Sequence, residues 1–534
     1  MTLRLADNEW GFSVTDNNPF RIFRMLQPLA KKSVGEDALI DLSRGDPGYG
    51  FTPGVRARRF MGYLLFLDTV FNNVEERVVT HCFRDNWDAQ WERVQQVTRA
   101  EYGESIGETY LSDLEFFLNR VIEMANSQGL SWNRFDVFYE TFKYCTVSGG
   151  TYHDPIGEQL VRVVVAAWHQ QTMDTKIDYN DLIFTSGASH AIGTMFKFLG
   201  DEGIGFLREH DRVLVTSPVY APYNSIMESR GIEVFTLEID PTTGQITEHS
   251  KQEMANYPHD VKAVIFVDPN NPTGFSMAPE TLEAVGAFAK EKNSLMITDE
   301  VYSSFFEDKK TMMDICPERT IRINARSKIE RSTGLRFGDV LVSKEGQEYI
   351  MNNILRDYVD SGQTWTEAFR CAKGPGGILG EFQHTTFVPG PCQILGAAHI
   401  ILGKEERGEY RKAVAGNMKI FTETLGLPHE GNMYYIIFDL NDVEGSNKQH
   451  VPVEEKLTQI AKRGVVFIPS NRFFSKSDRQ AKDRRNTVRA SVVNTTPENI
   501  RKAAEIVREY LCGSAPSMPT MQEKGVGVKN GAGA

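Results

Sequence analysis

The sequence predicts an α/β protein in which helices cover a mostly parallel sheet. From about residue 180 onward, short apolar runs alternate with amphipathic segments, which is typical of strand–helix–strand units. Five runs are expected to be strands, at residues 182–185, 212–216, 234–237, 263–267 and 295–298. The segment 279–292 between two of them has the pattern of a helix. Because ligands of such folds bind where the strands end, the polar residues after these strands are the first candidates for a site.

A helical insertion is expected before this sheet, and a smaller α+β domain after it. The clearest helix of the insertion spans residues 112–126, with Ser112 and Glu115 forming a capping box at its start. Its apolar residues share one helical face: Leu114, Phe117, Leu118, Val121 and Ile122. In the smaller domain we expect strands at 433–438 and 464–468 and a final helix at 497–511.

These patterns divide the chain into five predicted parts. They are an N-terminal arm with part of the small domain (1–58), the helical insertion (59–148), the large domain (149–375), the small C-terminal domain (376–512) and a disordered tail (513–534). The tail is rich in Gly, Ser, Pro and Lys and poor in aromatic residues, a composition that cannot bury a core.

The composition predicts a soluble, cytoplasmic protein and does not exclude a small anionic ligand. The 534 residues carry a net charge of −12, and this acidic balance disfavours a general nucleic-acid binder. No apolar run is long enough for a membrane span, and residues 1–23 lack the pattern of a secretory signal. Six cysteines without a C-x-x-C pair indicate reduced thiols, and neither a zinc ribbon nor another metal site is predicted.

The first candidate site residues follow the strand at 182–185. Ser186, Gly187, Ala188 and Ser189 form a small polar turn that leads into a helix. Free backbone N–H groups at a helix N-terminus, with a hydroxyl beside them, can bind a phosphate group. The alternative is an ordinary strand-to-helix turn with a serine cap.

Two further polar motifs follow the next strands. The run Asn270-Asn271-Pro272-Thr273-Gly274 is a rigid loop that can hold the Asn271 amide over a ligand. Asp299 ends the strand at 295–298, where a buried carboxylate needs a partner such as a protonated ring nitrogen. The alternative for Asp299 is a cap of the following helix.

A lysine flanked by arginines completes the set of motifs. Lys328 follows Arg326 and Ser327, and Arg336 stands eight residues further on. A lysine in a dry, partly cationic pocket has a lowered pKa and can form a Schiff base with an aldehyde, while Arg336 can neutralise a phosphate. By itself, a lysine near an arginine is usually surface charge.

In this order and spacing, the motifs resemble fold-type I pyridoxal 5′-phosphate (PLP) enzymes of the class I and II aminotransferase family. The resemblance covers roughly residues 44–511 apart from the helical insertion. It implies an aspartate-aminotransferase-like fold, PLP as the cofactor, an amino-acid substrate and a homo-oligomer of two or more subunits. It also implies that Lys328 is the Schiff-base lysine and that Asp299 is the partner of the pyridine nitrogen.

The same resemblance assigns roles to the other candidates. Asn271 and Tyr302 match the pair that contacts the phenolic oxygen of PLP, and Tyr220 matches the residue stacked on its ring. The phosphate site is matched by Ala188, Ser189 and Arg336, and Tyr152 matches the tyrosine that reaches the phosphate of the neighbouring subunit. Gly187 and Ser327 are further predicted cofactor-binding residues. Arg489, in Val488-Arg489-Ala490-Ser491, matches the arginine that binds the substrate α-carboxylate through two hydrogen bonds.

The length and the insertion are similar to the aspartate 4-decarboxylase branch of this family. Residues 43–47 and 381–385 carry this finer resemblance, and Arg44 matches an arginine of that branch's active site; its alternative is a surface salt bridge. Three residues depart from the expected pattern. Ala325 replaces a serine that supports the phosphate, Arg326 replaces a small or apolar residue, and Asp46 replaces an amide.

Two enzymatic hypotheses follow, together with one of another class. In the first, the enzyme decarboxylates or transaminates aspartate through an external aldimine and a ketimine, with Lys328 as general base and Arg44 binding the β-carboxylate. In the second, the departures at Ala325, Arg326 and Asp46 indicate β/γ-elimination or replacement on S-adenosylmethionine or a similar amino acid. The third, a non-catalytic regulator, is disfavoured because Lys328, Asp299 and Arg489 are all present.

Overall fold

The structure is a computed structural model that describes most of the chain. The described residues are 19–47, 54–71, 87–145, 154–240, 243–307, 309–365, 367–368, 388–428, 431, 433–476 and 483–513. Apart from Gly513, the predicted disordered tail lies outside these residues, as do Tyr152 and residues 381–385. Among the described residues, no helix has the length and apolar character that a membrane crossing needs.

A seven-stranded sheet forms the large domain and confirms the predicted fold class. In spatial order its strands are β2 (Leu182–Thr185), β8 (Gly338–Leu341), β7 (Thr320–Ala325), β6 (Leu295–Asp299), β5 (Val261–Val267), β3 (Arg212–Ser217) and β4 (Glu233–Glu238). Only β8 runs antiparallel to its neighbours, and the other pairs are parallel. The five predicted strands are confirmed, whereas β7 and β8 were not predicted.

Helices cover both faces of this sheet. They are α6 (Gln159–Gln170), α7 (Ala188–Leu199), α8 (Ala221–Ser229), α9 (Glu248–Met254), α10 (Pro279–Lys292), α11 (Met312–Ile315) and α12 (Lys344–Tyr349). On β5, Ala263, Ile265 and Val267 pack in one core with α7 and α8, whereas Val264 and Phe266 pack in another with α9 and α10. Because both faces are buried, β5 and most of the neighbouring central strands are rich in apolar residues.

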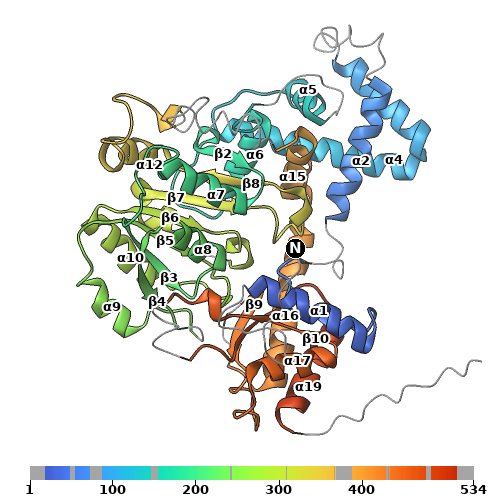
Figure 1. Ribbon diagram of the computed structural model, residues 1–534. Coiled ribbons are helices and arrows are strands. Elements are labelled where there is room, and N and C mark those ends of the chain that lie inside the picture. The colour runs from blue at the N-terminus through green and yellow to red at the C-terminus, as the bar shows by residue number, and fades with distance from the viewer. Residues whose placement is uncertain are drawn as a thin grey trace, which may run out of the picture.

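The small domain gathers segments from both ends of the chain. Its antiparallel sheet has the order β11 (Ile468–Pro469), β12 (Thr487–Ser491), β9 (Tyr435–Asp439), and β1 (Ile40–Asp41) pairs with β10 (Val465–Val466). Its helices are α1 (Pro19–Val34), α16 (Lys404–Leu425), α17 (Val453–Lys462) and α19 (Pro497–Leu511). Figure 1 shows blue α1 among the orange and red elements of the C-terminal part. The helix predicted at 497–511 is confirmed.

The helical insertion packs onto the edge of the large domain. It consists of α2 (Val55–Phe71), α4 (Trp87–Ser127) and α5 (Arg134–Cys145), and these share one apolar core with α6, β2 and α15 (Gly390–Leu402). Figure 1 shows α2 and α4 at the upper right, beyond the sheet. The domain boundaries stay a prediction, although α15 belongs by its packing to this core and not to that of the small domain.

The predicted start of the helix at Ser112 is wrong. Helix α4 begins at Trp87 and is kinked at Gly103, whose φ of 75° is left-handed, so Ser112 lies inside the helix and caps nothing. The neighbouring Asp113 is buried and accepts hydrogen bonds from Arg56 and Arg59 of α2. The predicted apolar face is confirmed, because Leu114, Phe117, Leu118 and Val121 are buried in the shared core.

Phe117→Ala is expected to destabilise the insertion strongly. The Phe117 ring is fully buried and its centroid lies 4.9 Å from that of Phe60. Its removal should lower the free energy of unfolding by about 3–5 kcal/mol, measured by urea denaturation. The neighbouring Phe116 is 42% exposed, so Phe116→Ala is a matched control that should cost less than about 1 kcal/mol. Equal effects of the two substitutions would contradict this packing.

Candidate active site

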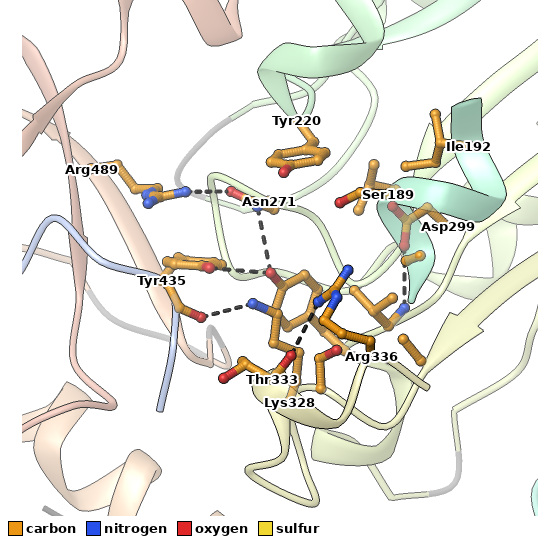
Figure 2. Close-up of a pocket in the computed structure, with 17 residues that line it drawn as sticks. Ser189, Ile192, Tyr220, Asn271, Asp299, Lys328, Thr333, Arg336, Tyr435 and Arg489 are labelled. Carbon is orange, nitrogen blue, oxygen red and sulfur yellow. Dashed lines mark hydrogen bonds between the residues drawn. The ribbon is translucent and has the colours of Figure 1, made fainter. Parts of the chain in front are cut away.

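One cavity lies where the central strands end and the small domain meets them. Its volume is about 230 Å³. The large domain contributes Ala188, Ser189, Ile192, Tyr220, Val267, Asn271, Asp299, Val301, Tyr302, Ala325, Ser327, Lys328, Thr333 and Arg336, and the small-domain side contributes Gly45, Tyr435 and Arg489. Figure 2 shows these side chains converging on a shared space from several elements. Most of the predicted site residues are therefore neighbours, although they span three hundred positions of the chain.

Asp299 lies at the carboxyl end of β6 and is fully buried. Its carboxylate accepts long hydrogen bonds from the Tyr223 hydroxyl (3.4 Å) and the Val301 N–H (3.4 Å). Burial raises the pKa of Asp299 to about 7, although these two hydrogen bonds and the nearby Lys328 oppose the shift. A cation in the cavity would therefore be required to keep this carboxyl fully ionised at neutral pH. Tyr223 was not predicted; the only signal was its position one helical turn after Tyr220.

Lys328 is half-buried, and its amine points across the cavity towards the small-domain side. The Nζ donates a hydrogen bond of 2.7 Å to the Gly45 carbonyl, which also accepts one of 2.8 Å from the Tyr434 hydroxyl. The same Nζ lies 5.6 Å from the ring centroids of Tyr302 and Tyr434. Figure 2 shows Tyr220 on the opposite side of the cavity from Lys328, so a planar ligand would fit between them.

A chain of hydrogen bonds runs along the wall of the cavity. Arg489 Nη1 donates to Asn271 Oδ1 (3.0 Å), the Asn271 amide donates to Tyr302 Oη (3.5 Å), and the Tyr302 hydroxyl donates to Tyr435 Oη (3.1 Å). The predicted pair Asn271 and Tyr302 is therefore in contact. Tyr435 was not predicted, and the only signal was a pair of tyrosines at the start of a predicted strand. Tyr434 adopts a left-handed φ of 75°, which brings the two rings within 4.8 Å.

Arg489 lies on β12 and is 3% exposed. Its Nη2 donates to the Ser43 carbonyl at 2.8 Å, and its Cζ lies 4.3 Å from the Tyr435 ring centroid. Among the described residues, nothing accepts a hydrogen bond from its buried Nε. The guanidinium is thus held in place by Asn271, Ser43 and Tyr435 and retains an unused donor for an anionic ligand.

The end of the cavity at the N-terminus of α7 suits a phosphate group. Gly187 has a left-handed φ of 83°, and a Cβ atom there would lie 2.6 Å from Arg336 Nη2. Arg336 donates to the carbonyls of Ser186 (3.0 Å) and Thr333 (3.1 Å) and is exposed, so it stands beside the free N–H groups of α7. A guanidinium and a helix N-terminus together favour an anion. Thr333 was not predicted.

Three predicted residues are not part of the cavity lining or lie outside the described residues. Arg44 is not part of the lining; its side chain is 52% exposed, and its Nε donates to Asp46 Oδ1 at 2.9 Å. Gly187 borders the lining through Arg336. Tyr152 lies outside the described residues, so its predicted contact with a neighbouring subunit stays a prediction.

Comparison with curated proteins gives relatives that share part of this chain. A probable aspartate aminotransferase of Methanocaldococcus jannaschii is 28% identical over 221 residues, which are 41% of this chain and 56% of the relative. A bifunctional aspartate aminotransferase and L-aspartate beta-decarboxylase of a Pseudomonas species is 29% identical over 169 residues, 31% of each chain. The chain spans about half, or less, of the length of these relatives.

Solved structures share the fold over a longer stretch. A putative kynurenine aminotransferase from Saccharomyces cerevisiae superposes with a TM-score of 0.60 at 18% identity, covering 95% of this chain and 99% of that one. A mutant of Thermus thermophilus aspartate aminotransferase superposes with a TM-score of 0.51 at 20% identity, covering 74% and 92%. These likenesses show an aspartate-aminotransferase-like fold.

The sequence also matches the family-wide pattern of such enzymes. The model of the family described as "Aminotransferase class I and II" matches residues 146–507. This stretch is more than half of the chain and includes all the large-domain residues that line the cavity, as well as Tyr435 and Arg489. The chain therefore belongs to the class I and II aminotransferase family of PLP-dependent enzymes.

Proposed function

We propose that this enzyme binds PLP through Lys328 and transfers the amino group of aspartate, with loss of the β-carboxylate as a second outcome. The observation that supports it is the convergence of Lys328, Asp299 and Arg489 on one cavity. When bound, PLP supplies an electron sink for the electrons released at the substrate Cα. The fold and family are shared with aminotransferases, whereas the individual roles below are our assignments.

The cavity residues fit PLP at both ends of the ring. Asp299 has a carboxyl whose pKa is raised by burial, and a protonated pyridine nitrogen is a cation that would ionise it. The phosphate would accept hydrogen bonds from the N-terminus of α7, and Arg336 would balance its charge. Ala325 offers no hydroxyl at the third position before Lys328, so Ser189, Ser327 and Thr333 supply the serine and threonine hydroxyls of this lining.

The remaining residues would bind and orient the substrate. Arg489 would hold the α-carboxylate, because a planar guanidinium donates two parallel hydrogen bonds. Lys328, once its amine is released by the incoming substrate amine, would act as the general base that removes the proton from Cα. Tyr302 and Asn271, already in contact, would hold the phenolic oxygen of the cofactor.

Aspartate as substrate requires a second cation for its β-carboxylate. The cations of the described lining are Lys328, Arg336 and Arg489, and each already has a task. Arg44 is our candidate, and it would have to leave Asp46 and turn towards the cavity when substrate binds. Support for aspartate comes from the relatives, several of which are named as aspartate aminotransferases.

A second candidate function is favoured by the character of the lining. Tyr220, Tyr302 and Tyr435 surround the space beyond Lys328, and Arg44 pairs with Asp46 outside it. An aromatic wall with no arginine in the described lining beyond Arg336 and Arg489, which are assigned to the phosphate and the α-carboxylate, suits a cationic or neutral side chain such as the sulfonium of S-adenosylmethionine. The reaction would then be elimination or replacement at Cβ or Cγ.

We also propose that the enzyme is at least a dimer, on the resemblance of the segment with Tyr152 to one that crosses to a partner.

Lys328→Ala is expected to abolish turnover, because no other amine lines the described cavity. Borohydride reduction of the wild-type holoenzyme followed by peptide mapping should label Lys328. Lys290→Ala is the control, since Lys290 lies on α10 and pairs with Glu318 at 3.1 Å, away from the lining. Label on a different lysine would overturn the assignment of Lys328.

Asp299→Asn is expected to remove a loss of unfolding free energy that the apoenzyme shows as the pH rises. The folded-state pKa of Asp299 is about 7 against an ordinary value of 3.8. Between these values the folded chain retains a proton that the unfolded chain has released, so stability falls as pH rises through this window and stays lower above it. At about 1.4 kcal/mol per pKa unit, the variant should exceed wild type by up to about 4 kcal/mol at pH 8.

The measurement is urea unfolding of both apoenzymes at pH 5 and pH 8. The excess in unfolding free energy of Asp299→Asn over wild type should be small at pH 5. At that pH the wild-type carboxyl is still protonated in the folded state, so only part of the destabilisation has developed. A difference that is the same at both pH values would show that Asp299 is already ionised without PLP.

Arg44→Ala is expected to separate the two candidate reactions. If aspartate is the substrate, loss of the buried partner proposed for its β-carboxylate costs about 3–5 kcal/mol, a loss of roughly a hundredfold to several thousandfold in kcat/KM for aspartate. Turnover of small monocarboxylic amino acids should be unchanged, which serves as the internal control. Wild-type enzyme that releases no carbon dioxide from aspartate, but releases methylthioadenosine from S-adenosylmethionine, would favour the second candidate.

A further inference from the structure

Arg326 is fully buried behind the residue that we assign to the cofactor. It stands two positions before Lys328, yet its guanidinium points away from the cavity lining. The Cζ atom lies 3.8 Å from the centroid of the Trp168 ring, and Nη2 donates to Asp339 Oδ1 at 3.1 Å. Trp168 belongs to α6 and Asp339 to β8, so one side chain joins the turn after β7 to two other elements.

A connected set of charged residues extends from this contact through the protein interior. Asp339 Oδ2 lies 2.8 Å from His169 Nε2, and His169 Nδ1 lies 2.7 Å from Arg322 Nη1. The Nε of Arg322 donates to Glu300 Oε2 at 2.8 Å. Glu300 directly follows Asp299. We call this set the buried charge relay; its members are Arg326, Asp339, His169, Arg322 and Glu300. Its two ends therefore lie beside Lys328 and Asp299 in the chain.

The protonation of the buried charge relay follows from its geometry. Burial lowers the pKa of His169 to about 4, so the ring is neutral at pH 7. An arginine can only donate, so Nδ1 of His169 is the acceptor and Nε2 carries the hydrogen that it donates to Asp339. Burial alone would raise the pKa of Asp339, but His169 and the two arginines hold it below its ordinary range. Arg326 thus donates to the ionised carboxylate of Asp339.

The backbone of the turn is fixed at the same place. Arg326 donates its N–H to the Phe337 carbonyl (2.8 Å), and its own carbonyl accepts from the Ser332 hydroxyl (2.7 Å). Its Nη1 also lies 3.9 Å from Glu330 Oε1, four residues along the turn. Residues that follow Lys328 in the turn are therefore tied to Arg326, which precedes it, whereas the Lys328 side chain has one hydrogen bond in the described structure, to Gly45.

We propose that Arg326 is a positioning residue for Lys328. Through its contacts with the buried charge relay and the Trp168 ring, Arg326 fixes the turn that carries the reactive amine. This inference rests on the assignment of Lys328 as the PLP lysine. Arg326 does not touch the cavity, so its removal should change the placement of the amine and leave the substrate-binding Arg489 unaffected. A displacement of reacting groups by about 1 Å lowers rates on the order of a hundredfold.

The test compares Arg326→Met with a matched control in the holoenzyme. Arg319 is another buried arginine on the approach to β7; its Nη1 donates to Asn293 at 2.9 Å, and its Cζ lies 4.7 Å from the Tyr349 ring, but it does not line the cavity. Arg326→Met should lower kcat by roughly tenfold to a hundredfold, with KM nearly unchanged. It should also change the visible circular dichroism of bound PLP. Arg319→Met should lower the melting temperature alone.

Two additional variants keep the proposal open to contradiction. Arg326→Lys retains the charge without the planar stack on Trp168 and should restore kcat in part. If Arg326→Met does not fold, kcat and circular dichroism are measured on Asp339→Asn instead. This substitution weakens the contact between Arg326 and residue 339 at nearly constant side-chain volume. Wild-type kcat and wild-type circular dichroism in the folded variant would overturn the proposal. Borohydride label on a lysine other than Lys328 in wild type would instead overturn the proposed function.

Discussion

The burial of Asp299 is the constraint on which the site depends. A carboxyl at the end of a central parallel strand is surrounded by apolar neighbours on both faces, so its ionised form is costly. The two hydrogen bonds that it accepts, from Tyr223 and Val301, are long, and its pKa stays near 7. The folded chain without ligand therefore holds an incompletely satisfied group that a cationic ring nitrogen would satisfy. On the proposed role of Asp299, cofactor binding would therefore be coupled to the stability of the sheet.

The small domain completes the site through close backbone contacts. Gly274, in the loop that carries Asn271, has a left-handed φ of 79°, and a Cβ there would lie 2.1 Å from the Tyr435 carbonyl. Its own carbonyl accepts the Met433 N–H at 2.9 Å. At Gly45 the close contact is with a side chain, since a Cβ there would lie 2.0 Å from the Tyr435 hydroxyl. These two glycines allow β9 to approach the large domain, and that approach brings Tyr435 and Arg489 to Asn271.

Sequence patterns predicted the parts of the structure that depend on local chemistry. The buried strands, the helix at 497–511 and the residues at the strand ends all have short-range signals, and Lys328, Asp299 and Asn271 converge as the resemblance implied. Contacts set by tertiary packing left weaker signals. Strand β7 contains Arg322 and Asn324, polar residues that obscured its apolar pattern, and they are buried because other elements supply their partners.

The same limit explains the wrong helix start at Ser112 and the position of Arg44 outside the cavity lining. Ser112 and Glu115 satisfy the capping pattern, yet α4 continues through them because its apolar face is buried against α2 and α6. Arg44 was placed in the site by resemblance, but a neighbour two residues away competes for its guanidinium. A sequence pattern cannot show which of two possible partners a charged side chain pairs with. The strength of each ion pair depends on how far its groups are removed from water.

The buried charge relay and the cavity lining place different limits on how this site can change. Arg322 and Arg326 are each matched by an acidic partner deep in the protein, so replacing one member leaves the other as an unpaired buried charge, at a cost of about 3–5 kcal/mol. Tyr435 and Gly45, in contrast, face the cavity from the small-domain side, where a substitution changes the space offered to a substrate. The cofactor end of the site is therefore held by interactions that must change together, whereas the substrate end can change one residue at a time.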